Sequence, residues 1–223
     1  MNNRYYCFPD IHGEYKLLKK ALDFVYLNNP DGGKIIFLGD YIDRGPNPLK
    51  VIETVRNPPE NWEFITLIGN HEQMFFQSYT KRTEFFDTKT AKNIAKLDEL
   101  PVLNYQQLHN AIPKDIIEWM YGSPIFHFEG NNVFAHATYD DNLLPEQQDI
   151  DDVVWTRYDD WTKFSSQNDR LFLTHGHTPR KNGPIKSPNR VNLDCGPFAY
   201  GRFVIGEYEY NVKGPVDFHE FIK

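Results

Sequence analysis

Short runs of apolar residues alternate with a helical pattern at the start of the chain. Residues 5–8, 34–38 and 64–68 are rich in aromatic and β-branched side chains, which is typical of buried β-strands. Between the first two runs, apolar side chains over 17–25 recur at helical spacing until the sequence NNP at 28–30 ends the pattern. This succession predicts a βαβ unit, in which a crossover helix joins two parallel strands.

A second crossover helix is expected before the third of these strands. Asn47 is a typical cap residue, and Pro48 suits the first position of a helix. We expect the buried face of this helix to include Leu49, Ile52 and Val55.

Further along the chain, apolar runs lie closer together and are joined by turn residues. We expect strands around 126–128, 133–135, 171–173, 191–193 and 203–205, and therefore an α/β fold with a mixed sheet. The Gly- and Pro-rich stretch 181–189 is expected to be a loop.

Residues 73–123 differ from the rest, because they combine helix formers with scattered aromatic side chains. A helix is predicted over 114–121, opened by Pro113 and closed by Gly122. We interpret the whole stretch as a helical cap.

The composition is that of a globular protein with a sizeable core. Of 223 residues, 40% are hydrophobic, and no stretch approaches the ~20 apolar residues of a membrane span. We expect one domain, 1–223, in a cytoplasmic protein without a membrane partner, and most simply a monomer. Cys7 and Cys195 lie far apart in the sequence and are expected to be free thiols.

The charge balance argues against one class of partner. The formal net charge is −7, and the sequence contains no basic stripe that could neutralise a phosphodiester backbone. Duplex nucleic acid is therefore not an expected partner.

Polar clusters follow the three predicted N-terminal strands: DIH at 10–12, GDYIDRG at 39–45 and GNHE at 69–72. Strand ends gather at one edge of an α/β sheet, so these residues are expected to converge on a pair of cations. Side chains alternate along a strand, so Asp10 and His12 are expected to point the same way and share one cation. Such a centre predicts metal-assisted hydrolysis of phosphate esters.

The other donors follow the remaining strands. The carboxylate of Asp40 can bridge two cations, and the amide oxygen of Asn70 suits the second one. His136 and His177 each come after an apolar strand and can donate imidazole nitrogen to that second cation. His175 is a rival ligand that we interpret as structural.

Taken together, these motifs resemble those of the phosphoprotein phosphatases, a branch of the metallophosphoesterases, and most of all the small bacterial and bacteriophage lambda type. The similarity rests on PDIHG at 9–13, the two motifs at 39–45 and 69–72, His136, GHTP at 176–179 and NLDCG at 192–196. It implies a single calcineurin-like domain, a mixed β-sheet sandwich flanked by helices with a helical cap insertion.

The resemblance also implies a dinuclear centre. One cation would be held by Asp10, His12 and Asp40, and the other by Asp40, Asn70, His136 and His177. A bridging hydroxide would attack phosphorus. Mixed oxygen and nitrogen donors suit Mn²⁺, which we expect, or iron or Zn²⁺.

The same resemblance assigns roles beside the cations. His71, paired with Asp43, would protonate the leaving oxygen. Arg44 and Asn70 would bind substrate phosphate, and Arg157 is the candidate for a second phosphate-binding arginine.

An alternative for Arg157 is stacking on Trp155 or Trp161. Two positions depart from the family pattern. Pro9 stands where glycine is usual, and Ala137 and Thr138 follow His136 in place of the two glycines of eukaryotic members.

Three functions remain open on these residues. The first is a metal-dependent phosphomonoesterase acting on phosphoserine or phosphothreonine proteins, with some activity on phosphotyrosine, or on small phosphoesters. The second is a symmetrical dinucleoside tetraphosphatase, although such enzymes have alanine at the position of Asp43 and aspartate at that of Glu72. The third is a catalytically silent phosphate-binding scaffold.

Overall fold

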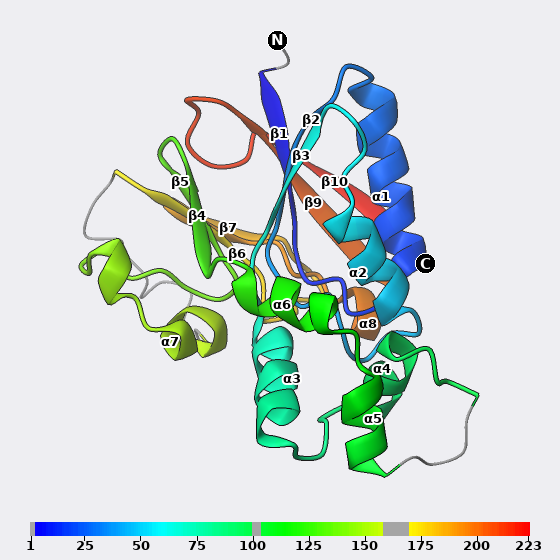
Figure 1. Cartoon of the computed structure of the whole chain (residues 1–223). Helices are drawn as coiled ribbons and strands as arrows, with labels where there is room; N and C mark the ends of the chain where they lie inside the picture. Colours follow the sequence, from blue (N-terminus) through cyan, green and yellow to red (C-terminus); the bar gives the residue numbers. More distant parts are fainter. Residues whose placement is uncertain (1–2, 100–103, 158–169) are drawn as a thin grey trace.

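The computed structural model describes residues 3–99, 104–157 and 170–223, which form two five-stranded sheets (Figure 1). The first sheet has the order β10-β9-β1-β2-β3, in which β1, β2 and β3 are parallel and β9 and β10 are antiparallel. Its strands are β1 Arg4–Phe8, β2 Gly33–Phe37, β3 Trp62–Thr66, β9 Arg202–Glu209 and β10 Asp217–Ile222.

The second sheet has the order β4-β5-β6-β8-β7, with β5, β6 and β8 parallel and the two outer strands antiparallel. Its strands are β4 Phe126–Glu129, β5 Asn132–Ala135, β6 Phe172–His175, β7 Ile185–Ser187 and β8 Arg190–Asn192. The prediction of mixed pairing is confirmed. The expected loop at 181–189 was wrong in part, because Ile185–Ser187 pairs with β8 through a tight turn.

Alternation along β1 explains how the layers pack. Tyr5 and Cys7 face the second sheet and contact Phe134 and Leu193 in a shared apolar cluster. Tyr6 and its neighbours on the opposite face pack against the helices. The first sheet is therefore covered on one side by the second sheet and on the other by α1, Tyr15–Asn28, and α2, Pro48–Arg56 (Figure 1).

The predicted βαβ unit is confirmed, and α2 begins at Pro48 as expected. Its details differ from the prediction. Asn47 makes no side-chain cap hydrogen bond. The buried face consists of Val51, Ile52 and Val55, whereas Leu49, which was expected on that face, is only half-buried. Leu49 lies toward α4, because its backbone N–H donates to an asparagine side chain of that helix.

Helices make up most of the described part of 70–122. They are α3 Asn70–Lys81, α4 Thr88–Ile94, α5 Tyr105–Ala111 and α6 Lys114–Gly122, of which α6 matches the predicted helix to within one residue. In Figure 1, α3, α4 and α5 lie below the two sheets. The remaining helical segments are the 3-10 turn Pro145–Gln147, α7 Ile150–Trp155 and α8 Pro197–Tyr200.

Both cysteines are buried free thiols, as predicted. Within the described residues, none of the helices combines the length and apolar character that crossing a bilayer requires.

Candidate metal centre

The polar clusters lie where β1, β2 and β3 end, but Asp10 and His12 do not reach the site by strand alternation. β1 ends at Phe8, and His12 has a φ of +46°, so the segment after the strand is a turn. The backbone N–H groups of Ile11 and His12 both donate to the Asp40 carbonyl, at 3.0 and 2.8 Å. The turn is thus held against the loop after β2, and the expectation that strand alternation makes Asp10 and His12 point the same way was wrong.

Backbone strain is concentrated in these loops. Nine described non-glycine residues have positive φ, and five of them are His12, Asp40, Asp43, Arg44 and His177. Each left-handed residue of this kind costs of order 1–3 kcal/mol and persists only where surrounding contacts hold it. The clustering marks a functional site.

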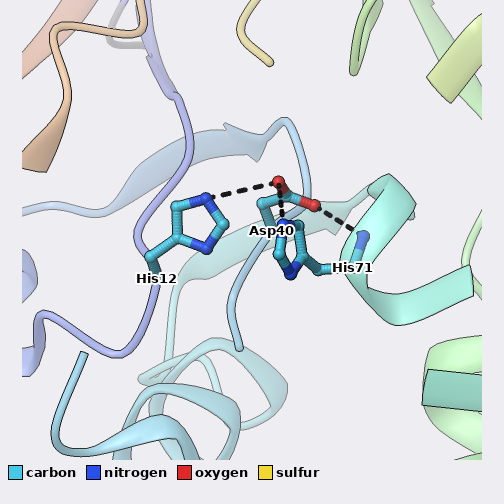
Figure 2. Close-up of side chains that lie close together, drawn as sticks. All are labelled: His12, Asp40 and His71. Carbon is cyan, nitrogen blue, oxygen red and sulfur yellow. Dashed lines mark hydrogen bonds and ion pairs between the residues drawn. The ribbon is translucent and has the colours of Figure 1, made fainter. Parts of the chain in front are cut away.

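Asp40 lies at the centre of the donor atoms (Figure 2). Its Oδ2 is 3.4 Å from His12 Nε2, 3.5 Å from His136 Nε2 and 4.0 Å from His71 Nε2. Its Oδ1 accepts the backbone N–H of His71 at 3.0 Å. One carboxylate oxygen therefore faces three imidazoles.

A second group of donors shares His136 with the first. Asn70 Oδ1 is 2.9 Å from His136 Nε2 and 3.0 Å from His177 Nδ1, and these two ring nitrogens are 3.1 Å apart. The ring nitrogen of His177 that faces this group is Nδ1. Oxygen and nitrogen lone pairs gathered at such distances fit a site built for a cation.

Backbone carbonyls orient two of the imidazoles. His12 Nδ1 lies 2.8 Å from the Ile42 carbonyl, and His136 Nδ1 lies 2.9 Å from the Leu38 carbonyl. A carbonyl only accepts, so each Nδ1 carries the proton and each Nε2 presents its lone pair to the Asp40 carboxylate region.

Burial also keeps two of the histidines neutral. It lowers the pKa of His12, and it lowers the pKa of His177 to about 3, an effect to which the charge of Arg157 adds. Neutral imidazole is the form that binds metal ions.

Two glycines leave room for the carboxylates. A Cβ on Gly69 would lie 2.2 Å from Asp40 Oδ1, and a Cβ on Gly176 would lie 2.1 Å from Asp10 Oδ1. These distances are well inside van der Waals contact, so any side chain at either position would displace a donor.

The residues present fit two divalent cations. His12, Asp40 and His71 place donor atoms within 4.8 Å of one another, as do Asp10, Asp40 and His136, so Asp40 is common to both groups. Asp10 Oδ2 is also 3.9 Å from His12 Nε2. Carboxylate and imidazole donors suit Mn²⁺, iron or Zn²⁺. All six residues expected as ligands meet in one buried region.

The residues expected to act on substrate lie beside this region. His71 Nδ1 is 2.6 Å from Asp43 Oδ2, and Arg44 Nη2 is 3.1 Å from His71 Nε2. Burial disfavours the charged imidazole of His71, but Asp40 and the hydrogen bond to Asp43 outweigh it and raise its pKa to about 8. His71 can therefore carry a proton near neutral pH.

Arg157 is exposed and follows α7, close enough for its charge to influence the pKa of His177. Trp161, one of its alternative stacking partners, lies outside the described residues. Pro9 is buried and follows the last residue of β1, so its missing N–H lies beyond the strand pairing.

Sequence reasoning assigned no role to Glu72, which the structure shows to be a central support. The buried carboxylate accepts backbone N–H groups from Gly69, Asp40 and Tyr41 at 2.8–3.0 Å, and from Ile42 at 3.3 Å. An acidic residue in the first turn of a helix is a recognisable signal. Its contacts with the loop after β2 were not visible in the sequence.

Gln73 was missed as well. Its amide donates to Asp151 at 2.6 Å and accepts from Trp155 Nε1 at 2.7 Å, so it holds α7 against α3. The ring of Trp155 consequently lies 6.4 Å from that of His177.

Comparison with known proteins agrees with this site. The family model described as calcineurin-like phosphoesterase matches residues 4–201. The chain is 32% identical to serine/threonine-protein phosphatase 2 of Salmonella typhimurium over 66% of its own length and 65% of that protein's, just under two thirds. It is 26% identical to the asymmetrical bis(5'-nucleosyl)-tetraphosphatase PrpE of Anoxybacillus flavithermus, over 89% of this chain and 88% of that protein.

Among solved structures, the fold is similar to that of a protein provisionally named a diadenosine tetraphosphatase. The TM-score is 0.70 at 16% identity, and the match covers 100% of this chain and 94% of the other.

Proposed function

The chain belongs to the calcineurin-like phosphoesterases, and from this premise we propose that it is a serine/threonine protein phosphatase. The substrate would be a phosphoprotein or a small phosphomonoester. One observation carries the proposal beyond the family: the buried pair of His71 and Asp43, with Nδ1 and Oδ2 at 2.6 Å. A symmetrical dinucleoside tetraphosphatase is expected to have alanine in place of Asp43.

Two divalent cations would be held by the six residues expected as ligands: Asp10, His12, Asp40, Asn70, His136 and His177. Bound there, they would supply positive charge at the phosphate oxygens and lower the pKa of an attacking solvent molecule. The carbonyls of Leu38 and Ile42 would keep His136 and His12 in the required tautomer.

His71 would donate a proton from Nε2 to the leaving oxygen, while Asp43 accepts the hydrogen bond from Nδ1 and stabilises the charged ring. In the structure Arg44 donates to that same Nε2, which therefore carries no proton there. Substrate phosphate would draw the guanidinium away, because a dianion is the stronger acceptor. The freed Nε2 would take up a proton from solvent, as the raised pKa of about 8 allows, and would pass that proton to the leaving oxygen. Asn70 and Arg157 would complete the phosphate contacts.

A second candidate function is hydrolysis of dinucleoside tetraphosphates. It is supported by the Anoxybacillus flavithermus relative, 88% of whose length is covered by the match to this chain. The name of that relative specifies asymmetrical cleavage, whereas the sequence led us to expect the symmetrical reaction. A third, a silent phosphate-binding scaffold, is disfavoured by the complete set of polar groups around Asp40.

The decisive experiment compares substrates on one preparation. Protein loaded with Mn²⁺ should hydrolyse para-nitrophenyl phosphate and phosphoserine peptides, and kcat/KM for the peptides should exceed that for diadenosine tetraphosphate. A higher kcat/KM for the dinucleotide would establish the second candidate. A preparation with both metals bound and no turnover of any substrate would establish the third.

Some expectations from the sequence stay predictions. These are a single domain over 1–223, a cap over 73–123 that selects substrates, a cytoplasmic location and a monomeric state. Light scattering of the purified protein tests the monomeric state. The cap is tested by replacing the 73–123 segment with that of a relative, which should change the substrate preference to that of the relative.

A further inference from the structure

One exposed aromatic ring lies directly beside the proposed general acid. Phe86, in the connection between α3 and α4, is 68% exposed, and its ring lies 5.6 Å from the His71 ring at an interplanar angle of 76°. Single exposed aromatic residues are common on protein surfaces. Phe86 is distinguished by its position at the proposed proton donor and by how its neighbours are fixed.

The residue before it is an anchor. Phe85 is 2% exposed and stacks on Phe75 and on His109, with ring centroids 4.6 Å apart in both pairs. Burying a phenylalanine side chain contributes about 1.5–3 kcal/mol, so this contact holds the connection in place.

The residue after Phe86 ties the connection to the site. Asp87 Oδ1 accepts the backbone N–H groups of Lys89 and Thr90 at the start of α4, at 2.9 and 3.1 Å. Its Oδ2 accepts the backbone N–H of Arg44 at 3.3 Å. Phe86 is therefore held between two fixed residues, and its exposed ring is presented to solvent beside His71.

The position of the ring defines what it can contact. In the proposed function His71 Nε2 protonates the oxygen that leaves phosphorus, so the group bonded to that oxygen lies next to the His71 ring. An aryl group bonded directly to the oxygen would come within reach of Phe86. A serine or threonine side chain offers no ring for it to pack against.

We propose that Phe86 is a specificity-determining residue that packs against the ring of an aryl leaving group and so raises kcat/KM for aryl phosphates such as phosphotyrosine. The inference rests on the proposed function, because that function places the leaving group at His71. An aromatic pair favours offset or edge-to-face contact, which the exposed ring leaves available.

The test uses the Mn²⁺-loaded protein and two variants, Phe86→Ala and Phe86→Trp. For each variant, kcat/KM is measured on a phosphotyrosine peptide and on the same peptide with phosphoserine. Each value is divided by the wild-type value for the same peptide. This normalisation cancels the difference in leaving-group reactivity between the two peptides. We expect Phe86→Ala to lower the phosphotyrosine value about threefold to tenfold and the phosphoserine value less than about twofold. Phe86→Trp should keep the phosphotyrosine value.

A binding measurement separates this inference from the proposed function. The wild type should bind phenylphosphonate, which is not hydrolysed, more tightly than butylphosphonate, and Phe86→Ala should remove the difference. Leu27→Ala is the control, because Leu27 is 82% exposed at the far end of α1 and should change nothing.

Equal losses on both peptides, or no loss on either, would overturn the role of Phe86, as would equal binding of the two phosphonates by the wild type. If phenylphosphonate binding depends on Phe86 while no phosphoester is turned over, the proposed function is wrong and the aromatic contact stands. A wild type that binds neither phosphonate overturns both.

Discussion

His71 Nδ1 and Asp43 Oδ2 are 2.6 Å apart, and both side chains are buried. A carboxylate only accepts hydrogen bonds, so the proton of this contact lies on Nδ1. The other ring nitrogen faces Arg44 and the Asp40 carboxylate. Asp43 thus fixes both the orientation and the tautomer of His71.

Replacing His71 by asparagine should lower kcat about 10²–10⁴-fold, because the proposed proton donor to the leaving oxygen is lost. Steady-state kinetics on a phosphopeptide, with metal content measured in parallel, checks this. His127→Asn is the matched control, since His127 lies on β4 and contacts Glu129. A His71→Asn protein with full metal content and unchanged kcat would remove His71 from its proposed role.

Asp43→Asn should lower kcat less than His71→Asn does, because the amide oxygen can still accept from Nδ1 but carries no charge. If Asp43 acts only through His71, the double variant His71→Asn/Asp43→Asn should be no slower than His71→Asn alone. Additive losses in this cycle would show that Asp43 has a separate role.

Gly176→Ala should lower the affinity for one cation by at least about tenfold, because the new Cβ would lie 2.1 Å from Asp10 Oδ1 and displace that donor. Isothermal titration calorimetry with Mn²⁺ measures the affinity. Gly122→Ala provides the control, since a Cβ there meets nothing within 4 Å. Unchanged Mn²⁺ binding in Gly176→Ala would exclude Asp10 from the centre.

Glu72→Gln should lower the free energy of unfolding by about 1–3 kcal/mol. The glutamine NH₂ group would face backbone N–H groups that now donate to the carboxylate, so buried donors would lose their acceptor. Urea unfolding with and without Mn²⁺ measures the change. Glu118→Gln, on the exposed side of α6, should leave stability within about 0.5 kcal/mol. Equal stability of the two variants would contradict the supporting role of Glu72.

Removing divalent cations with a chelator should lower Tm. At a free Mn²⁺ concentration of about 100 times Kd, binding contributes about 2.7 kcal/mol, which corresponds to about 5–10 °C for a domain of this size. Differential scanning calorimetry of the protein with Mn²⁺ and with chelator measures the shift. A Tm independent of Mn²⁺ would count against the centre.

The sequence indicated which side chains converge, because each of them follows an apolar run and parallel strands bring such ends together. Asp40 and His136 illustrate this: they come from different sheets, yet Oδ2 and Nε2 are 3.5 Å apart. Motif spacing predicted which strands end at the site. It did not predict how the chain turns there, and the left-handed backbone of His12 replaced the expected strand alternation.

Other features were hidden because they depend on contacts between distant segments. The carbonyls of Leu38 and Ile42 belong to the backbone and carry no residue-specific signal. Phe85 and Phe86 are identical in the sequence, and only the packing of α3 and α5 decides that the first is buried and the second exposed.

The division of the donors between two sheets has a consequence for how the protein acquires its metal. Asp10 and Asp40 follow strands of one sheet, whereas His136 and His177 follow strands of the other. Until the two sheets have docked through their shared apolar layer, neither half offers a complete coordination sphere. Cation uptake during refolding should therefore be a late kinetic step that reports on sheet docking.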